Sequence, residues 1–238
     1  MRKIYLVPNL VTTANLFCGF YSLICTVKNE PVQAAWALVA ASVFDALDGR
    51  IARLAKATSE FGVQYDSLSD LVSFGVGPGF LLYSWALSDF GRIGFVASFL
   101  FLVCGALRLA RFNVTSEILP KGLFQGLPIP GGAGLVSTFV IFSESMKWSV
   151  ESFRFPLLIA TFLISGLMIS SIPFPSFKEL NWRSKGSFGL LLMGVLSLVL
   201  IALRPDVMLF VVLSGYVISC LVWNSFRALR KGSTPKVA

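Results

Sequence analysis

Four aspartates lie close together in the sequence, in a pattern that favours metal-assisted chemistry. Asp45, Asp48, Asp66 and Asp70 fall within 26 residues of a 238-residue chain that holds only 12 acidic side chains. The first two are three residues apart and the last two are four apart, so each pair shares one face of a helix. Neighbouring carboxylates repel one another unless cations lie between them. Two hard divalent cations sharing these ligands would relieve the repulsion and would suit phosphoryl transfer.

The rest of the composition excludes most other catalytic chemistry. The sequence has no histidine, which removes Ser-His-Asp triads and His-ligated zinc and favours Mg²⁺ or Mn²⁺ as the metal. Its four cysteines lie in apolar stretches without C-x-x-C spacing, so neither a disulfide framework nor a zinc site is indicated. The net charge is +8. Because Lys and Arg flank apolar runs and form no basic face with interleaved aromatics, we expect no nucleic-acid partner.

The elements that must position the aspartates are membrane helices. Hydrophobic residues make up 55% of the chain and charged residues 13%, and the mean hydropathy is +0.78. A soluble domain of this size cannot bury so much apolar surface. The sequence therefore predicts an all-α integral membrane protein, a polytopic helical bundle with about eight transmembrane helices. The candidate spans are 10–27, 32–52, 68–88, 93–112, 132–147, 155–172, 187–203 and 206–226.

Basic residues give this layout an orientation. With the amino terminus in the cytoplasm, 15 Lys and Arg residues lie on the cytoplasmic side and 5 on the other, as the positive-inside rule requires. Both termini and the aspartates are then cytoplasmic. We expect one membrane domain, residues 1–238, with a basic cytoplasmic tail at 227–238 that contacts membrane lipid. Residues 54–61 are predicted to form a short turn that joins the two aspartate-bearing helices.

Residues 45–70 carry a specific resemblance. They read D-x-x-D-G-x-x-A-R-x8-G-x3-D-x3-D without a departure, which resembles the signature of the CDP-alcohol phosphotransferase family. The resemblance implies a six-helix membrane core, a homodimer, and a site with two divalent cations that faces the cytoplasm of a prokaryotic inner membrane. It further implies that all four aspartates bind the metals and that Asp70 also accepts the proton of the attacking alcohol.

The resemblance also implies contacts to the CDP group. Small residues next to the acids allow close approach of backbone or base, and a long arginine stem on the same helix reaches a diphosphate. The Pro8-Asn9 and Thr12 segment resembles the part of the family's first helix that lies near the nucleotide. The implied CDP-binding residues are Asn9, Thr12, Asp48, Gly49, Ala52, Arg53, Ser59 and Gly62.

Three other stretches bear on the acceptor alcohol. Residues 69–78, 108–113 and 126–130 together resemble the phosphatidylserine synthase branch of the family, which implies CDP-diacylglycerol and L-serine as substrates. Arg108, Arg111 and Lys121 are candidate serine-binding residues, because a guanidinium suits a carboxylate. The two arginines could instead be topology anchors or bind lipid phosphates.

Several alternatives stay open. Another acceptor within the family, such as glycerol 3-phosphate, inositol phosphate or choline, would use the same four aspartates. A divalent-cation transporter also places carboxylates in a membrane, but it predicts acids spread across the depth of several helices. A structural membrane scaffold leaves the aspartate spacing unexplained.

Overall fold

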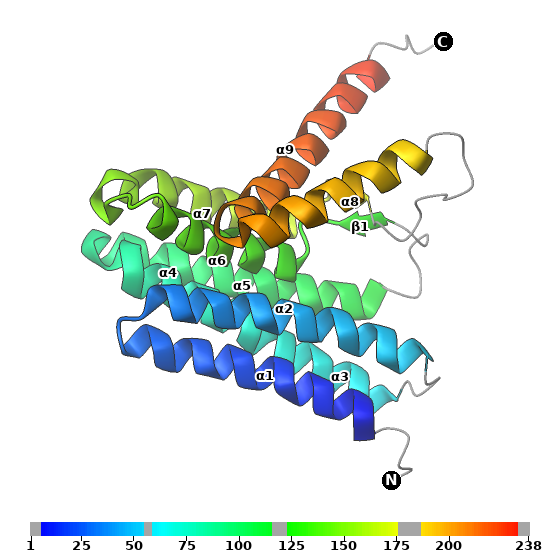
Figure 1. The fold of residues 1–238 in the computed structure, drawn as a ribbon, viewed down its shortest axis with the longest axis horizontal. Coiled ribbons are helices and arrows are strands. Elements are labelled where there is room, and N and C mark those ends of the chain that lie inside the picture. Colours follow the sequence, from blue (N-terminus) through cyan, green and yellow to red (C-terminus); the bar gives the residue numbers. More distant parts are fainter. Residues whose placement is uncertain (1–5, 55–58, 116–122, 176–186, 233–238) are drawn as a thin grey trace.

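The structure is a helical bundle with a small two-stranded ladder (Figure 1). It is a computed structural model that describes residues 6–54, 59–115, 123–175 and 187–232. The α-helices are α1 (Leu6–Val27), α2 (Pro31–Leu54), α3 (Glu60–Asp70), α4 (Gly77–Leu82), α5 (Arg92–Thr115), α6 (Ile129–Ser145), α7 (Arg154–Ile169), α8 (Ser187–Leu203) and α9 (Pro205–Gly232). The short helices are η2 (Leu71–Val76), η3 (Tyr83–Leu87), η4 (Ser88–Phe90) and η5 (Val150–Ser152), and the strands are β1 (Leu123–Gln125) and β2 (Pro173–Pro175).

Each of the eight apolar segments named from the sequence contains a helix. Among the described residues, four helices are long and apolar enough to cross a membrane: Asn9–Val27, Glu60–Phe90, Arg92–Val114 and Pro205–Asn224. The helices α6, α7 and α8 are shorter, at 17, 16 and 17 residues. The prediction of a helical membrane protein is therefore confirmed, while the count of eight transmembrane helices stays a prediction.

The β ladder is a feature that the sequence did not predict. Strand β1 pairs antiparallel with β2, Phe124 opposite Phe174. Beside it, the Gly126 N–H donates to the carbonyl of Ile172 at 2.9 Å, and Gly126 has a φ of 76°. Buried backbone N–H and C=O groups outside a helix need other hydrogen-bond partners. The ladder supplies such partners in the segment between α5 and α6 and in the segment after α7.

Helix α1 packs against α2 and the α3–η2 segment through small and polar residues. Its buried face carries Thr12, Asn15, Gly19, Ser22 and Thr26, alternately three and four residues apart, which places them on one face of the helix. Small residues on such a face let two helix backbones approach closely. The polar positions of α1 thus face protein and not lipid.

Residues Glu60–Phe90 form one helical run that contains two π-helical turns, η2 and η3. Proline lacks an N–H and clashes with the carbonyl four residues before it, and Pro78 is the second residue after η2. The wider turn, in which the Gly77 N–H donates to the Val72 carbonyl, continues the helix past this proline. The run thereby carries Asp66 and Asp70 on its first, α-helical part.

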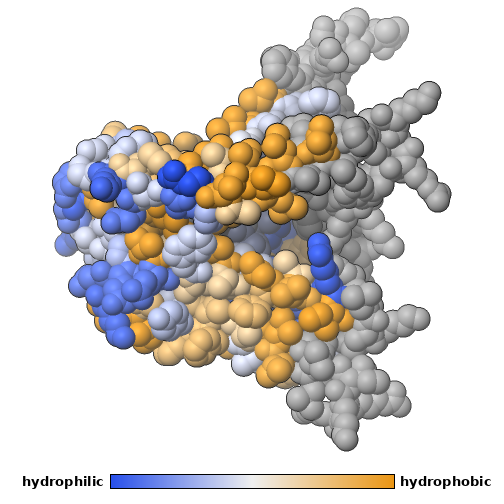
Figure 2. Space-filling view, viewed as in Figure 1, coloured by the Kyte–Doolittle hydropathy of each residue, from blue (hydrophilic) through white to orange (hydrophobic). Residues whose placement is uncertain are grey.

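The bundle has two different ends. On the face shown in Figure 2, one end is hydrophilic and the middle is largely apolar. At an end formed by the α1–α2 turn and the α6–α7 connection, Arg154 forms ion pairs with Asp89 and, at 3.7 Å, with Glu151. The beginning of α1 and the end of α9 both lie toward the other end (Figure 1), as do the end of α2 and the beginning of α3. The aspartates therefore occupy the end of the bundle opposite these ion pairs.

Close packing of α1 on η2 leads to a first prediction. A Cβ at Gly19 would clash with Ser73 Oγ and would lie 2.7 Å from Ser73 Cα. The backbone clash cannot be relieved by a rotamer change, so Gly19→Ala should destabilise the protein by about 1–3 kcal/mol. Thermal unfolding in detergent measures this. Gly166→Ala on α7, where a Cβ meets nothing within 4 Å, is the matched control. Equal stability of Gly19→Ala and wild type would contradict the packing.

Candidate active site

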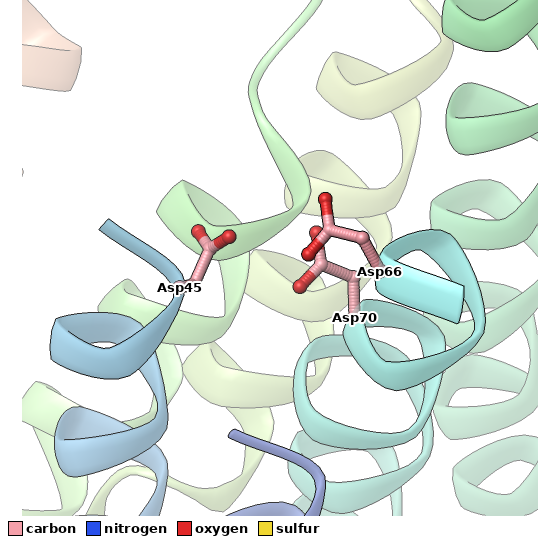
Figure 3. Close-up of side chains that lie close together, drawn as sticks. All are labelled: Asp45, Asp66 and Asp70. Carbon is pink, nitrogen blue, oxygen red and sulfur yellow. The ribbon is translucent and has the colours of Figure 1, made fainter. Parts of the chain in front are cut away.

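Three carboxylates from two helices meet at one point. Oxygens of Asp45 on α2 and of Asp66 and Asp70 on α3 all lie within 4.8 Å of one another. Figure 3 shows Asp66 and Asp70 side by side on α3 and Asp45 facing them from α2. Asp70 is 8% exposed, and the other two are half-buried. The spacing of four residues in the sequence thus places two carboxylates on one face of α3, as expected.

The fourth aspartate has a different environment. Asp48 lies one helical turn after Asp45, is 5% exposed and accepts a hydrogen bond from the Thr12 hydroxyl of α1. It is outside the group of three that lie within 4.8 Å of one another. The structure therefore brings together three of the four predicted metal ligands and places the fourth beside them, with one oxygen bonded to α1.

Helix α1 positions the carboxylates of both neighbouring helices. Asn15 Nδ2 donates to Asp70 Oδ1 at 3.0 Å, and Thr12 donates to Asp48. In return, Ser69 and Ser73 of the α3–η2 segment each donate to a carbonyl of α1 at 3.0 Å, those of Thr12 and Asn15. Hydrogen bonds to an ionised carboxylate stabilise its charged form and fix its orientation.

Helix α5 closes the site from another side. Arg108 is 8% exposed and interacts electrostatically with Asp70. Further along the helix, Asn113 Nδ2 donates to Ser67 Oγ at 2.9 Å. A positive charge next to a buried carboxylate offsets the cost of burying it. Of the two candidate serine-binding arginines, both on α5, Arg108 is the one with an electrostatic interaction with Asp70.

Three of the expected CDP-binding residues meet at the beginning of α3. Ser59 is its N-cap, with Oγ accepting from the Gly62 N–H at 3.0 Å, a common way to satisfy a helix amino end. A Cβ at Gly62 would lie 3.7 Å from Asn9 Oδ1 and 3.1 Å from Ser59 Oγ. The beginning of α1 and the beginning of α3 are therefore neighbours, although Asn9 and Gly62 are 53 positions apart in the sequence.

The other predicted residues divide into three groups. Gly49 is exposed on α2. Arg111 donates to the carbonyl of Ile169 at 3.2 Å and to Gln125, so its guanidinium joins α5 to the end of α7 and to β1. Ala52 and Arg53 belong to the last turns of α2, but their side chains lie outside the described part, as does the whole of Lys121.

Sequence reasoning missed Asn15, Ser69 and Ser73. Asn15 is 0% exposed, and the two serines are 1% and 0% exposed. A signal was present, because Thr12 and Asn15 begin a series of small and polar residues at helical spacing within an apolar segment. Ser69 and Ser73 are likewise four residues apart, so they share one helix face, and they lie on either side of Asp70 in the sequence.

The donor set suits hard divalent cations. Carboxylate oxygens are the only metal ligands in the described group, and Mg²⁺ and Mn²⁺ prefer such ligands. Without a cation, three carboxylates this close would repel one another in a partly buried setting. The residues present therefore fit the metal that phosphoryl transfer would use.

The comparison with known families identifies the class of protein. Residues 5–172 match the model of the CDP-alcohol phosphatidyltransferase family. The chain belongs to this family of transferases, as the signature at residues 45–70 indicated. The family is generally dependent on divalent cations, in agreement with the acidic group on α2 and α3.

Several curated relatives are similar over most of their length. A CDP-diacylglycerol–serine O-phosphatidyltransferase of Helicobacter pylori is 37% identical over 218 residues, which is 92% of this chain and 90% of the relative. Proteins with the same name are 37% identical in Methanocaldococcus jannaschii, over 75% of this chain and 78% of the relative, and 34% identical in Bacillus subtilis, over 73% and 92%.

The hydrogen bond from α1 to Asp70 leads to a second prediction. Asn15→Leu removes the donor and should lower CMP-forming activity about 10- to 100-fold, because residues that orient metal-binding groups typically have effects of this size. Initial rates and the metal concentration for half-maximal activity measure it.

Thr26→Val is the matched control, since the Thr26 hydroxyl is also buried on α1 but donates to the Ser22 carbonyl of its own helix. Equal rates for Asn15→Leu and Thr26→Val would contradict a positioning role of Asn15.

Proposed function

We propose that this protein transfers the phosphatidyl group of CDP-diacylglycerol to the hydroxyl of L-serine and releases CMP. The observation that carries the proposal is the group of three carboxylates at one end of the bundle, within a chain that belongs to the CDP-alcohol phosphatidyltransferase family. The choice of serine is supported by relatives named for that reaction, one of them 37% identical over 92% of this chain.

Asp45, Asp48, Asp66 and Asp70 hold two divalent cations, Mg²⁺ or Mn²⁺, in this proposal. The cations would neutralise the diphosphate and the charge that develops on the transferred phosphorus. The support is that three of these carboxylates lie within 4.8 Å of one another. Asp48 lies one turn away, with Oδ2 accepting a hydrogen bond from Thr12, which leaves its other oxygen for a ligand.

Asp70 acts as the general base. It accepts the proton of the serine hydroxyl as the hydroxyl oxygen attacks the β-phosphorus, which carries the diacylglycerol. The new phosphorus–oxygen bond forms while the bond from the β-phosphorus to the bridging oxygen breaks, so CMP leaves with that oxygen. Asn15 keeps the Asp70 carboxylate oriented throughout. Catalysis then rests on positioning and charge stabilisation.

The CDP group binds along α1, α2 and the beginning of α3. The proposed contacts are Asn9, Thr12, Asp48, Gly49, Ala52, Arg53, Ser59 and Gly62. The proximity of Asn9 to Gly62 and of Ser59 to Gly62 supports a common binding surface. The Ser59 hydroxyl caps α3, so its part in the site includes holding the amino end of that helix in place.

Arg108, Arg111 and Lys121 are the proposed serine-binding residues. The electrostatic interaction of Arg108 with Asp70 is the observation that supports Arg108. Arg111 already donates hydrogen bonds to Gln125 and to the Ile169 carbonyl. It would therefore affect serine binding indirectly, by holding the segment around β1 in place.

The remaining architecture follows the family. Residues 5–172 contain six of the predicted spans and form the catalytic core, and α8 and α9 bring the total to eight within one membrane domain, residues 1–238. The 15 to 5 distribution of Lys and Arg supports a cytoplasmic site and cytoplasmic termini in the inner membrane of a prokaryote. The protein is proposed to work as a homodimer.

An assay with a panel of acceptors tests the reaction. Purified protein with CDP-diacylglycerol and Mn²⁺ or Mg²⁺ should form phosphatidylserine and an equal amount of CMP when L-serine is present. Removal of the metal with EDTA should abolish both products, and its return should restore them. Product from glycerol 3-phosphate, inositol phosphate or choline, with none from serine, would overturn the choice of acceptor.

The role of Asp70 is tested by Asp70→Asn. This change keeps the size of the side chain but removes the base, so turnover should fall by about 10²- to 10⁴-fold, while thermal unfolding in detergent stays within a few degrees of wild type. Glu30→Gln, at the other end of α1 and α2, is the control for loss of a negative charge. Near-normal turnover of Asp70→Asn would remove Asp70 from the mechanism.

A further inference from the structure

One hydrogen bond joins α1 to α3 at the surface of the molecule. Thr13 Oγ1 and Tyr65 Oη are 2.9 Å apart, and Thr13 also donates to the Asn9 carbonyl of its own helix at 2.7 Å. A threonine hydroxyl has one hydrogen to donate. Because this hydrogen bonds to the Asn9 carbonyl, the Tyr65 hydroxyl is the donor to Thr13. A chain of two hydrogen bonds therefore runs from Tyr65 of α3 through Thr13 to the first turn of α1.

The buried side of the same helix contact has a hydrogen bond of its own. Ser69 donates to the Thr12 carbonyl at 3.0 Å, and both residues are buried, whereas Thr13 is exposed and Tyr65 is half-buried. Thr12 and Thr13 are consecutive, so they point about 100° apart around α1. Bonds on two sides of one contact limit how far α3 can roll against α1, which bonds on one side alone would not do.

The surroundings of the surface bond are apolar. Leu10 and Phe17, three residues before and four after Thr13, share its face of α1 and are each 66% exposed. On α3, Phe61 stacks on Tyr65, with ring centroids 5.9 Å apart and an angle of 14° between the planes. Where lipid takes the place of water, a hydroxyl without a partner is costly. Separation of the two helices here would leave the Tyr65 hydroxyl without its acceptor, so the bond stabilises their contact.

The hydrogen-bonded chain reaches the expected CDP-binding surface. Asn9, whose carbonyl accepts from Thr13, is one of the proposed CDP contacts. Gly62 is another: it lies three residues before Tyr65, on the same face of α3, and a Cβ there would lie 3.7 Å from Asn9 Oδ1. Ser59 caps the helix by accepting from the Gly62 N–H. The spacing between the first turns of α1 and α3 therefore sets the shape of this surface.

We propose that Tyr65 and Thr13 are positioning residues for nucleotide binding. Their hydrogen bond holds the beginning of α3 against the beginning of α1, which keeps Asn9, Ser59 and Gly62 in register for the CDP group. The inference rests on the proposed function, from which the CDP-binding surface is taken. Tyr65 occupies one of the unspecified positions of the signature at residues 45–70, so the signature itself does not point to it.

The two ends of the α1–α3 contact then have separate tasks. Asn15 orients Asp70 and acts on turnover, whereas Tyr65 acts on the affinity for the nucleotide. Loss of the Tyr65 hydroxyl should weaken binding of CDP and of CDP-diacylglycerol and leave kcat and KM for serine nearly unchanged. A purely structural role would instead lower the stability of the protein and change every kinetic constant.

The test is Tyr65→Phe, which keeps the ring beside Phe61 and removes only the hydroxyl. KM for CDP-diacylglycerol should rise about 3- to 10-fold, the size of one hydrogen bond between membrane helices. The dissociation constant of CDP, measured with Mg²⁺ from the thermal stabilisation of the protein in detergent, should rise by the same factor. Changes in kcat and in KM for serine should stay below about twofold. Tyr83→Phe, in η3 of the same helical run, is the control and should behave as wild type.

Thr13 allows a second test of the same bond. Thr13→Val keeps the shape of the side chain and removes the acceptor, so it should raise the same two constants by a similar factor. Thr13→Ser keeps a hydroxyl and should restore them. The double variant Thr13→Val, Tyr65→Phe should bind CDP no more weakly than either single variant, because all three lack the same interaction.

The possible outcomes are distinct. Unchanged CDP affinity in Tyr65→Phe would overturn the proposal, as would losses in the two single variants that multiply in the double variant. A higher Mg²⁺ requirement with unchanged CDP affinity would assign the bond to Asp66, which follows Tyr65, and would also overturn it. A wild type that forms no phosphatidylserine, but whose CDP binding depends on Tyr65, would overturn the choice of serine and support this inference.

Discussion

Repulsion between carboxylates in an apolar bundle is the constraint on which the rest of the structure depends. Charged groups taken out of water need compensating charges or hydrogen bonds, and like charges a few ångströms apart increase the cost. The molecule supplies compensation from two helices that carry no site aspartate. Helix α1 gives hydrogen-bond donors to Asp48 and Asp70, and α5 gives the positive charge of Arg108. The aspartates alone do not make the site, because its geometry depends on the helices around them.

The role of α1 as a supplier of hydrogen bonds to the aspartates explains its polar residues. A spanning helix with Thr12 and Asn15 in its first half would be costly if these side chains faced lipid. They face α2 and α3, and Gly19 lets the α3–η2 segment approach to the distance at which their hydrogen bonds form. The same polar residues that weaken α1 as a simple membrane anchor make it the positioning element of the site.

Much of this arrangement could be predicted from the sequence, and the remainder shows where sequence reasoning stops. The positions of eight helical segments and the pairing of carboxylates follow from hydropathy and from spacing of three and four residues, which are local properties. The donors of α1 to Asp48 and Asp70 join residues 36 and 55 positions apart, and Arg111 finds its partner on a strand that forms only when two distant segments meet. Such contacts depend on tertiary packing and leave only a weak pattern in one sequence.

The π-helical turn after Asp70 has a consequence for how this helix can change. An α-helix rotates by about 100° per residue, and a π turn holds roughly one residue more than an α turn. Beyond η2, Gly77 and Gly79 pack closely on Leu38 and on the Ser98 carbonyl, so that part of the helix cannot rotate freely. Deletion of one residue from η2 would turn Asp66 and Asp70 away from Asp45 and leave every downstream contact in place. The number of residues between the carboxylates and Pro78, and not only their chemical nature, therefore sets the angular register of the metal ligands.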